Sequence, residues 1–113
     1  MRPPEGVVLL MDMLDHARRA ISAARGRVRE DLERDDLLAA GLERFIEVVG
    51  EAASKVSEGT RHGLPGIPWR EIVGMRNRLV HGYASVDHDI TWNVVSIDLP
   101  MLVTALEDAL RDA

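Results

Sequence analysis

Four side chains able to take part in catalysis or ligand binding lie in the stretch from Met75 to Tyr83, which reads MRNRLVHGY: Arg76, Asn77, His81 and Tyr83. Arginine offers phosphate oxygens a planar, permanently charged fork, and histidine can exchange a proton near neutral pH. Asn77 follows Arg76 directly and precedes His81 by four residues, so on a helix it points between them. Arg76, Asn77 and His81 could therefore converge on one ligand.

The position of Arg76 on its expected helix calls for an explanation. At about 100° per residue, Arg76 falls within an apolar stripe. The stripe consists of Trp69, Ile72, Val73, Leu79, Val80 and Tyr83. Burying an unpaired guanidinium is costly, so we expect an anion, water or a second chain beside Arg76. The alternative, a cation that complements the helix dipole near its C-terminus, explains Arg78 but explains Arg76 poorly.

An arginine and a histidine together suit phosphoryl chemistry. An RNA backbone carries its own nucleophile, the 2′-OH, so a base and a charge stabiliser could cleave it without a metal. Gly82 is expected to end the helix, which places the hydroxyl of Tyr83 near this site, where it could form a hydrogen bond or be modified.

Residues for other common chemistries are missing from the sequence. It has no cysteine, which excludes disulfides, thiolate zinc sites and a cysteine nucleophile. It has neither a glycine-rich phosphate loop with a lysine nor a helical histidine pair with a glutamate, and its serines lack an elbow motif. The four histidines are scattered along the chain: His16, His62, His81 and His88. We therefore predict neither a metal site nor a cofactor.

Length and charge restrict the class of protein. The chain has 113 residues, enough for one domain over residues 1–113, and a net charge of -5, which argues against a protein that coats DNA. Residues 61–83 nevertheless hold four arginines and one glutamate, so a small anion site fits there. The apolar run at 7–11 is too short to span a membrane, and a cytoplasmic location is expected.

Apolar residues spaced by three and four predict a chain made of helices. We expect flexible residues at 1–6, a helix at 7–25 and a charged segment at 28–34 that is either a short helical turn or an extension. Asp35 or Asp36 should cap a helix that runs to about residue 58.

The second half of the chain is expected to hold a loop and two more helical stretches. Glycines and prolines at 59–68 indicate the loop, and a third helix should run from Pro68 to Gly82. A last helical stretch should begin after Asp87, with a kink or restart at 98–100 because Pro100 lacks an N–H. The predicted fold class is all-α, an antiparallel bundle of four to five helices.

Glu51 lies among small residues in the middle of the second long helix, in the sequence Gly50-Glu51-Ala52-Ala53. Small residues there favour close packing by a neighbouring helix over a phosphate loop. Two interpretations of Glu51 stay open: a solvated or ion-paired carboxylate, or a supporting residue near the arginines of the 61–83 region.

The spacing of Arg76, His81 and Tyr83 resembles the RxxxxHxY motif of the HEPN superfamily, specifically its HepT-like toxins. Flanking sequence is also similar to that family: Leu42 to Ala53, Ile67 to Ile72, Val86-Asp87, Trp92 and Asp98 to Pro100. The similarity covers nearly the whole chain. It implies an all-helical, HEPN-like homodimer in which both copies of the motif face one cleft at the interface.

The resemblance also implies roles for the motif residues. His81 would activate the 2′-OH and Arg76 would stabilise the charged phosphorane of a metal-independent endoribonuclease, leaving a 2′,3′-cyclic phosphate. Asn77 would orient His81 or the phosphate. The family's usual partner is an MntA-type nucleotidyltransferase antitoxin that transfers AMP onto the motif tyrosine, which is Tyr83 here. Two alternatives remain: a non-catalytic nucleotide-binding or scaffolding subunit of such a transferase, and a helical dimerisation module.

Overall fold

The structure is a computed structural model that describes residues 4–79 and 87–111, and within these ranges every regular element is helical. In chain order the elements are α1 (Pro4–Ala24), α2 (Asp31–Arg34), α3 (Asp36–Ser54), α4 (Glu58–His62), α5 (Trp69–Val73), α6 (Met75–Leu79), α7 (His88–Asn93), the π-helix η1 (Val94–Asp98) and α8 (Leu99–Arg111). The predicted all-α fold class is confirmed.

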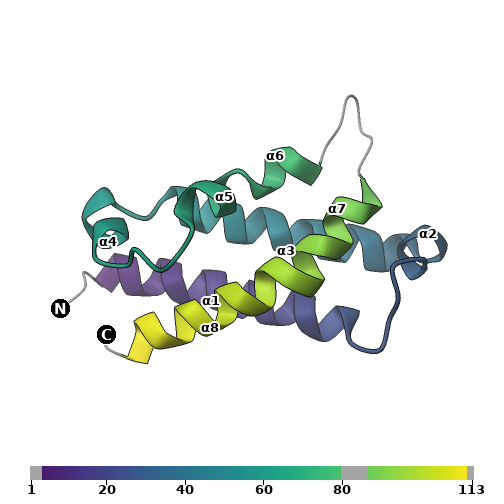
Figure 1. The fold of residues 1–113 in the computed structure, drawn as a ribbon, viewed down its shortest axis with the longest axis horizontal. Helices are drawn as coiled ribbons and strands as arrows, with labels where there is room; N and C mark the ends of the chain where they lie inside the picture. Colours follow the sequence, from purple (N-terminus) through teal and green to yellow (C-terminus); the bar gives the residue numbers. More distant parts are fainter. Residues whose placement is uncertain (1–3, 80–86, 112–113) are drawn as a thin grey trace.

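Three long helices form the frame of the bundle, and the short helices lie around it. α1 runs along α3, and the continuous stretch of α7, η1 and α8 crosses them (Figure 1). α5 and α6 pack on α3, so the MRNRLVHGY stretch begins on the same side of the bundle as the middle of α3. The molecule measures 46 × 30 × 19 Å. None of the described helices combines the length and hydropathy that a membrane span needs.

Apolar residues of the long helices form one core. Leu10 and Met13 of α1, Leu42 and Ile46 of α3, and Leu106 of α8 are fully buried. Their spacing by three or four residues within each helix places them on one face, as the sequence predicts. Burying this face supplies most of the stability of the helices, because isolated helices of this length are marginal in water.

The two predicted N-caps are confirmed, and one ambiguity is resolved. Asp35, rather than Asp36, caps α3, since its carboxylate accepts a hydrogen bond from the Leu38 N–H at 3.0 Å. Asp87 caps α7 by accepting from the N–H groups of Asp89 and Ile90. Each cap satisfies backbone donors that the first helical turn leaves without an intrahelical partner.

Several predicted boundaries are wrong by a few residues. α1 begins at Pro4 instead of residue 7, because proline fits the first position of a helix. α3 ends at Ser54 rather than near residue 58. The Ser57 hydroxyl accepts from the Thr60 N–H at 3.2 Å and starts the additional helix α4 inside the predicted loop. The segment at 28–34 forms the short helical turn α2 at its end.

The third predicted helix is interrupted at Gly74, so the expectation of one helix from 68 to 82 is wrong at this point. Gly74 separates α5 from α6, and its carbonyl accepts from the N–H of Asn77, three residues on, at 3.1 Å. A Cβ at Gly74 would lie 3.3 Å from the Arg70 carbonyl oxygen, so the tight turn favours glycine. The predicted end at Gly82 lies outside the described residues.

Pro100 produces the predicted irregularity in the last helical stretch. Residues 94–98 form a π-helix, and the N–H of Leu99 donates to the carbonyl of Val94, five residues earlier. α8 then begins at Leu99, so Pro100 occupies the first turn, where a missing N–H costs no helical hydrogen bond. The helical stretch therefore restarts immediately before the proline.

Candidate active site

The short helix α6 carries the first half of the MRNRLVHGY motif and is anchored by two apolar side chains. Met75 and Leu79 are 2% and 1% exposed, respectively, and lie four residues apart on the face that meets the bundle. Arg76, Asn77 and Arg78 lie between them and are exposed. The anchoring of Met75 and Leu79 therefore presents three consecutive polar side chains to solvent.

Arg76 lies on the exposed face of α6, not on a buried apolar stripe. Its side chain is 58% exposed. The predicted stripe runs through Trp69 and Val73, which are only partly buried, whereas the buried face runs through Ile72, Met75 and Leu79. Arg76 lies beside that face and not on it. The cost of burying a guanidinium therefore gives no evidence for an anion at Arg76.

Arg76 meets Glu51 of α3, and a second arginine contacts the same carboxylate oxygen. Glu51 Oε1 lies 3.9 Å from Arg76 Nη1 and 3.6 Å from Arg44 Nη1. Arg44 Nη1 also lies 3.5 Å from Oε2 of Glu47. Glu51 is thus an ion-paired carboxylate, and one of its partners belongs to the motif. The sequence left open whether Glu51 is an ion-paired carboxylate or a residue that supports the arginines of the 61–83 region. The two interpretations are compatible.

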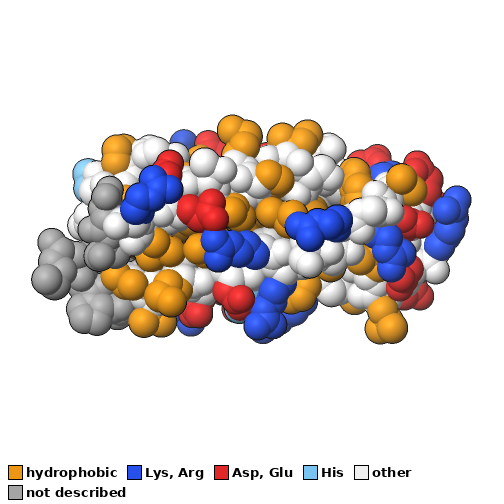
Figure 2. All heavy atoms as spheres, turned by 90° about the horizontal axis from the view of Figure 1, so that it is seen from below, with side chains coloured by type: hydrophobic (Ala, Val, Ile, Leu, Met, Phe, Trp, Pro, Cys, Tyr) orange, Lys and Arg blue, Asp and Glu red, His pale blue; other side chains and the backbone are white. Residues whose placement is uncertain are grey.

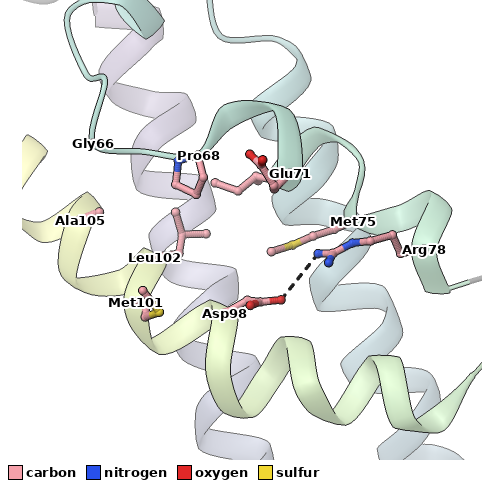
Figure 3. Close-up of a pocket in the computed structure, with 10 residues that line it drawn as sticks. Gly66, Pro68, Glu71, Met75, Arg78, Asp98, Met101, Leu102 and Ala105 are labelled. Carbon is pink, nitrogen blue, oxygen red and sulfur yellow. Dashed lines mark ion pairs between the residues drawn. The ribbon is translucent and has the colours of Figure 1, made fainter.

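Arg78 points to the opposite side of α6 and pairs with Asp98 at the end of η1, with 3.6 Å between Nη2 and Oδ2 (Figure 3). The sequence predicts only a helix-end charge for Arg78, because no local pattern marks a partner twenty residues away. The two side chains line a cavity of about 310 Å³ between α5, α6 and α8, which is otherwise mainly apolar. Met75 and Leu102 form part of its wall.

His81 and Tyr83 lie outside the described residues, so the structure does not place them relative to Arg76. The described ends of the intervening segment are joined: the N–H of Asp87 donates to the carbonyl of Leu79 at 3.0 Å. Because Leu79 is buried on α6, this bond holds the residue before α7 beside the end of α6.

Arg61, which was counted with the basic residues of the site, has a structural role. It donates to the carbonyl oxygens of Ala53 at 2.9 Å and Val56 at 3.1 Å, near the end of α3. Its guanidinium also lies 5.7 Å from the ring centroid of Trp69. Arg61 therefore ties the C-terminus of α3 to the start of α5 and is not a candidate ligand for substrate.

Two further histidines are engaged by their own helices. Nδ1 of His16 lies 2.8 Å from the Asp12 carbonyl oxygen, and Nδ1 of His62 lies 3.0 Å from that of Glu58. Within residues 4–79 and 87–111, no three histidine, aspartate or glutamate side chains are grouped closely enough to hold a metal ion. On the face turned away from α6, arginine and acidic side chains are interspersed (Figure 2).

A family model described as "Ribonuclease HepT-like" matches residues 13–109, which is most of the chain. The chain belongs to the HepT-like ribonuclease family. The described part of the MRNRLVHGY motif, α6, lies within the matched range, as do α3 and η1, which supply Glu51 and Asp98. The predicted family is therefore confirmed.

The chain is also similar to individual proteins with ribonuclease names. Two are named "Putative RNase": one from Methanocaldococcus jannaschii is 29% identical over 87% of this chain and 90% of its own, and one from Caldanaerobacter subterraneus subsp. tengcongensis is 31% identical over 80% and 81%. A "Probable ribonuclease HepT" from Thermococcus cleftensis is 39% identical over 52% of this chain and 54% of its own. No solved structure matches this HepT-like chain.

Proposed function

We propose that this HepT-like protein is a metal-independent endoribonuclease, the toxin of a HEPN/nucleotidyltransferase toxin–antitoxin pair. The observation that carries the proposal is the exposure of Arg76 on α6, next to the fixed ends of the segment that holds His81. An exposed arginine can meet a phosphate of a long polymer without an opening of the core. Relatives named as RNases support RNA as the substrate.

The proposed reaction uses the nucleophile that RNA itself carries. His81 takes the proton of a 2′-OH, whose oxygen forms a bond to the adjacent phosphorus. Arg76 stabilises the negative charge of the phosphorane, and Asn77 orients His81 or the phosphate. The bond from phosphorus to the 5′-oxygen then breaks, and that oxygen takes up a proton from His81 or water. The products are a 2′,3′-cyclic phosphate end and a 5′-hydroxyl end.

A second copy of the chain completes the proposed active site. A guanidinium open to water on one side stabilises a developing charge less than one in a closed site, because water screens the interaction. In a homodimer with the two α6 helices facing one cleft, each copy would remove water from the other's Arg76. The proposal therefore includes a homodimer with the active site at its interface.

The proposed control of the activity is covalent. An MntA-type nucleotidyltransferase antitoxin would transfer AMP from ATP onto the hydroxyl of Tyr83, releasing pyrophosphate. The added group is bulky and negatively charged, so beside Arg76 and His81 it would exclude an RNA phosphate by sterics and by like-charge repulsion. Both proteins and the RNA would meet in the cytoplasm.

The proposed reaction is tested by cleavage of labelled RNA in EDTA. Wild type and the control His62→Ala, which replaces a histidine bonded to its own helix, should cleave, whereas His81→Ala should not. Analysis of the ends should find a 2′,3′-cyclic phosphate. Equal cleavage by wild type and His81→Ala would exclude the assignment of His81.

One observation favours a second candidate function, a non-catalytic nucleotide-binding or scaffolding subunit that partners a nucleotidyltransferase. Arg76 is already paired with Glu51, as a structural arginine would be. Under this alternative the purified protein binds nucleotide or the transferase but cuts no RNA, and its expression alone does not arrest growth. A protein that serves only as a dimerisation module would bind neither nucleotide nor the transferase.

A further inference from the structure

Glu51 is held between two arginines, at a point where α3 and α6 come close. Its Oε1 atom lies 3.6 Å from Arg44 Nη1, on the same helix, and 3.9 Å from Arg76 Nη1 across the gap to α6. Arg44 Nη1 also lies 3.5 Å from Oε2 of Glu47, so Arg44 contacts both glutamates. Four charged groups thus form a chain that starts on α3 and ends at the motif arginine.

The residue before Glu51 explains why the two helices come so close. Gly50 is buried, and a Cβ there would lie 3.3 Å from the carbonyl oxygen of Ile72 and 3.9 Å from that of Val73. The end of α5 therefore rests directly on the α3 backbone. Since α6 follows α5 after Gly74 alone, this contact sets the distance between Glu51 and Arg76.

We infer that Glu51 is a positioning residue that acts through Arg76, and this inference rests on the proposed function. An exposed arginine has several rotatable bonds and would otherwise sample many orientations. A carboxylate on the rigid helix α3 restricts them, and Arg44 holds that carboxylate in turn. Among the described residues, Arg76 has its charged contact through Nη1, which leaves Nε and Nη2 as donors for a phosphate.

Positioning by Glu51 has a kinetic signature that distinguishes it from a simple charge effect. The negative charge of Glu51 repels RNA, so its removal alone would lower KM and leave kcat unchanged. If Glu51 also fixes Arg76 for the transition state, its removal lowers kcat, because misplaced catalytic groups lose the advantage of orientation. The inference therefore predicts a lower kcat without a higher KM.

The experiment compares Glu51→Gln, which keeps the size but removes the charge, with Glu47→Gln as the matched control on the same helix. Both side chains contact Arg44, but only Glu51 reaches Arg76. Glu51→Gln should lower kcat about tenfold with KM unchanged or reduced. Glu47→Gln should match wild type, and Glu51→Asp should recover part of the loss.

A double-mutant cycle tests whether Glu51 acts through Arg76. In an Arg76→Ala background, Glu51→Gln should cause no further loss of kcat, because the group that it positions is gone. Equal effects in both backgrounds would overturn the inference, as would a wild-type kcat in Glu51→Gln alone. If Arg76→Ala abolishes cleavage while Glu51→Gln cleaves normally, the proposed function stands and only the inference fails.

A measurement without RNA keeps the inference testable if the wild type cuts nothing. NMR relaxation of the Arg76 Nε–Hε group reports the order of its side chain. Glu51→Gln should lower that order and Glu47→Gln should leave it unchanged. Equal order in wild type and Glu51→Gln would overturn the inference independently of any enzymatic activity.

Discussion

The backbone N–H of Asp87 donates to the carbonyl of Leu79 at 3.0 Å, so the chain leaves α6 and enters α7 at adjacent points. α6 itself is held from two sides, by the pair of Arg76 with Glu51 and the pair of Arg78 with Asp98. The residue before α7 therefore lies beside the end of α6, a helix whose two arginines contact α3 and η1.

The close approach of α3 and α5 predicts different responses at two glycines of the same helix. Gly50→Val should lower the free energy of unfolding by about 1–3 kcal/mol, because the added methyl groups meet the Ile72 carbonyl and force α5 outward. A Cβ at Gly41 meets nothing within 4 Å, so Gly41→Val should change stability by less than about 0.5 kcal/mol. Urea denaturation measures both, and equal losses would contradict the packing at Gly50.

The pH dependence of stability should reveal the half-buried carboxylate of Glu43 on α3. Burial raises the pKa of Glu43, and the charge of Glu47 adds to the rise while His88 opposes it. The folded protein therefore binds this proton more tightly than the unfolded chain, and ionised Glu43 costs stability at neutral pH. As the pH falls through the raised pKa, the cost is relieved.

Glu43→Gln should accordingly raise the free energy of unfolding near neutral pH, and the gain should shrink below the usual pKa of a glutamate, about 4.3. The measurement is urea denaturation at both pH values, with the exposed Glu30→Gln as a control that changes little at either. A gain of equal size at both pH values would contradict the explanation from burial.

Modification of Tyr83 should appear as a mass change. Incubation with the cognate nucleotidyltransferase and ATP should add AMP to the intact chain and stop RNA cleavage, and Tyr83→Phe should prevent both effects because it lacks the acceptor hydroxyl. Intact-mass spectrometry measures the addition. An AMP adduct that persists in Tyr83→Phe would exclude Tyr83 as the acceptor.

Light scattering after size-exclusion chromatography should give twice the 12.5 kDa mass of one chain. A second copy that covers α6 should also protect the backbone amides of α6 from hydrogen exchange as the concentration rises. A monomer at every concentration that supports RNA cleavage would contradict an active site completed at a dimer interface.

The long helices of this fold could be predicted because their apolar spacing persists for several turns. Leu10 and Met13 on α1 and Leu42 and Ile46 on α3 lie where the pattern places them, and the caps at Asp35 and Asp87 follow from local chemistry. Nothing local marks Gly74 as a break, since apolar residues continue on both sides at helical spacing. A separate error placed Arg76 on the wrong face: the expected stripe included the partly buried Trp69 and Val73 and left out the buried Met75.

The composition of the candidate site could be predicted from the motif, but its contacts could not. Glu51 and Asp98 are separated in sequence from Arg76 and Arg78 by whole helices, and no periodicity links such pairs. Their contacts depend on how α6 lies between α3 and η1, which in turn depends on Gly50 and the break at Gly74.

The most direct test of the account compares two arginines of the same short helix. Arg76 and Arg78 are both exposed on α6, but only Arg76 occupies the arginine position of the RxxxxHxY spacing. In EDTA, Arg76→Ala should cleave labelled RNA about 10²–10³-fold more slowly than wild type, as expected for the loss of a donor to the transition-state charge, while Arg78→Ala should keep most of the activity. Equal rates for wild type and Arg76→Ala, or equal losses in the two variants, would contradict the role of Arg76.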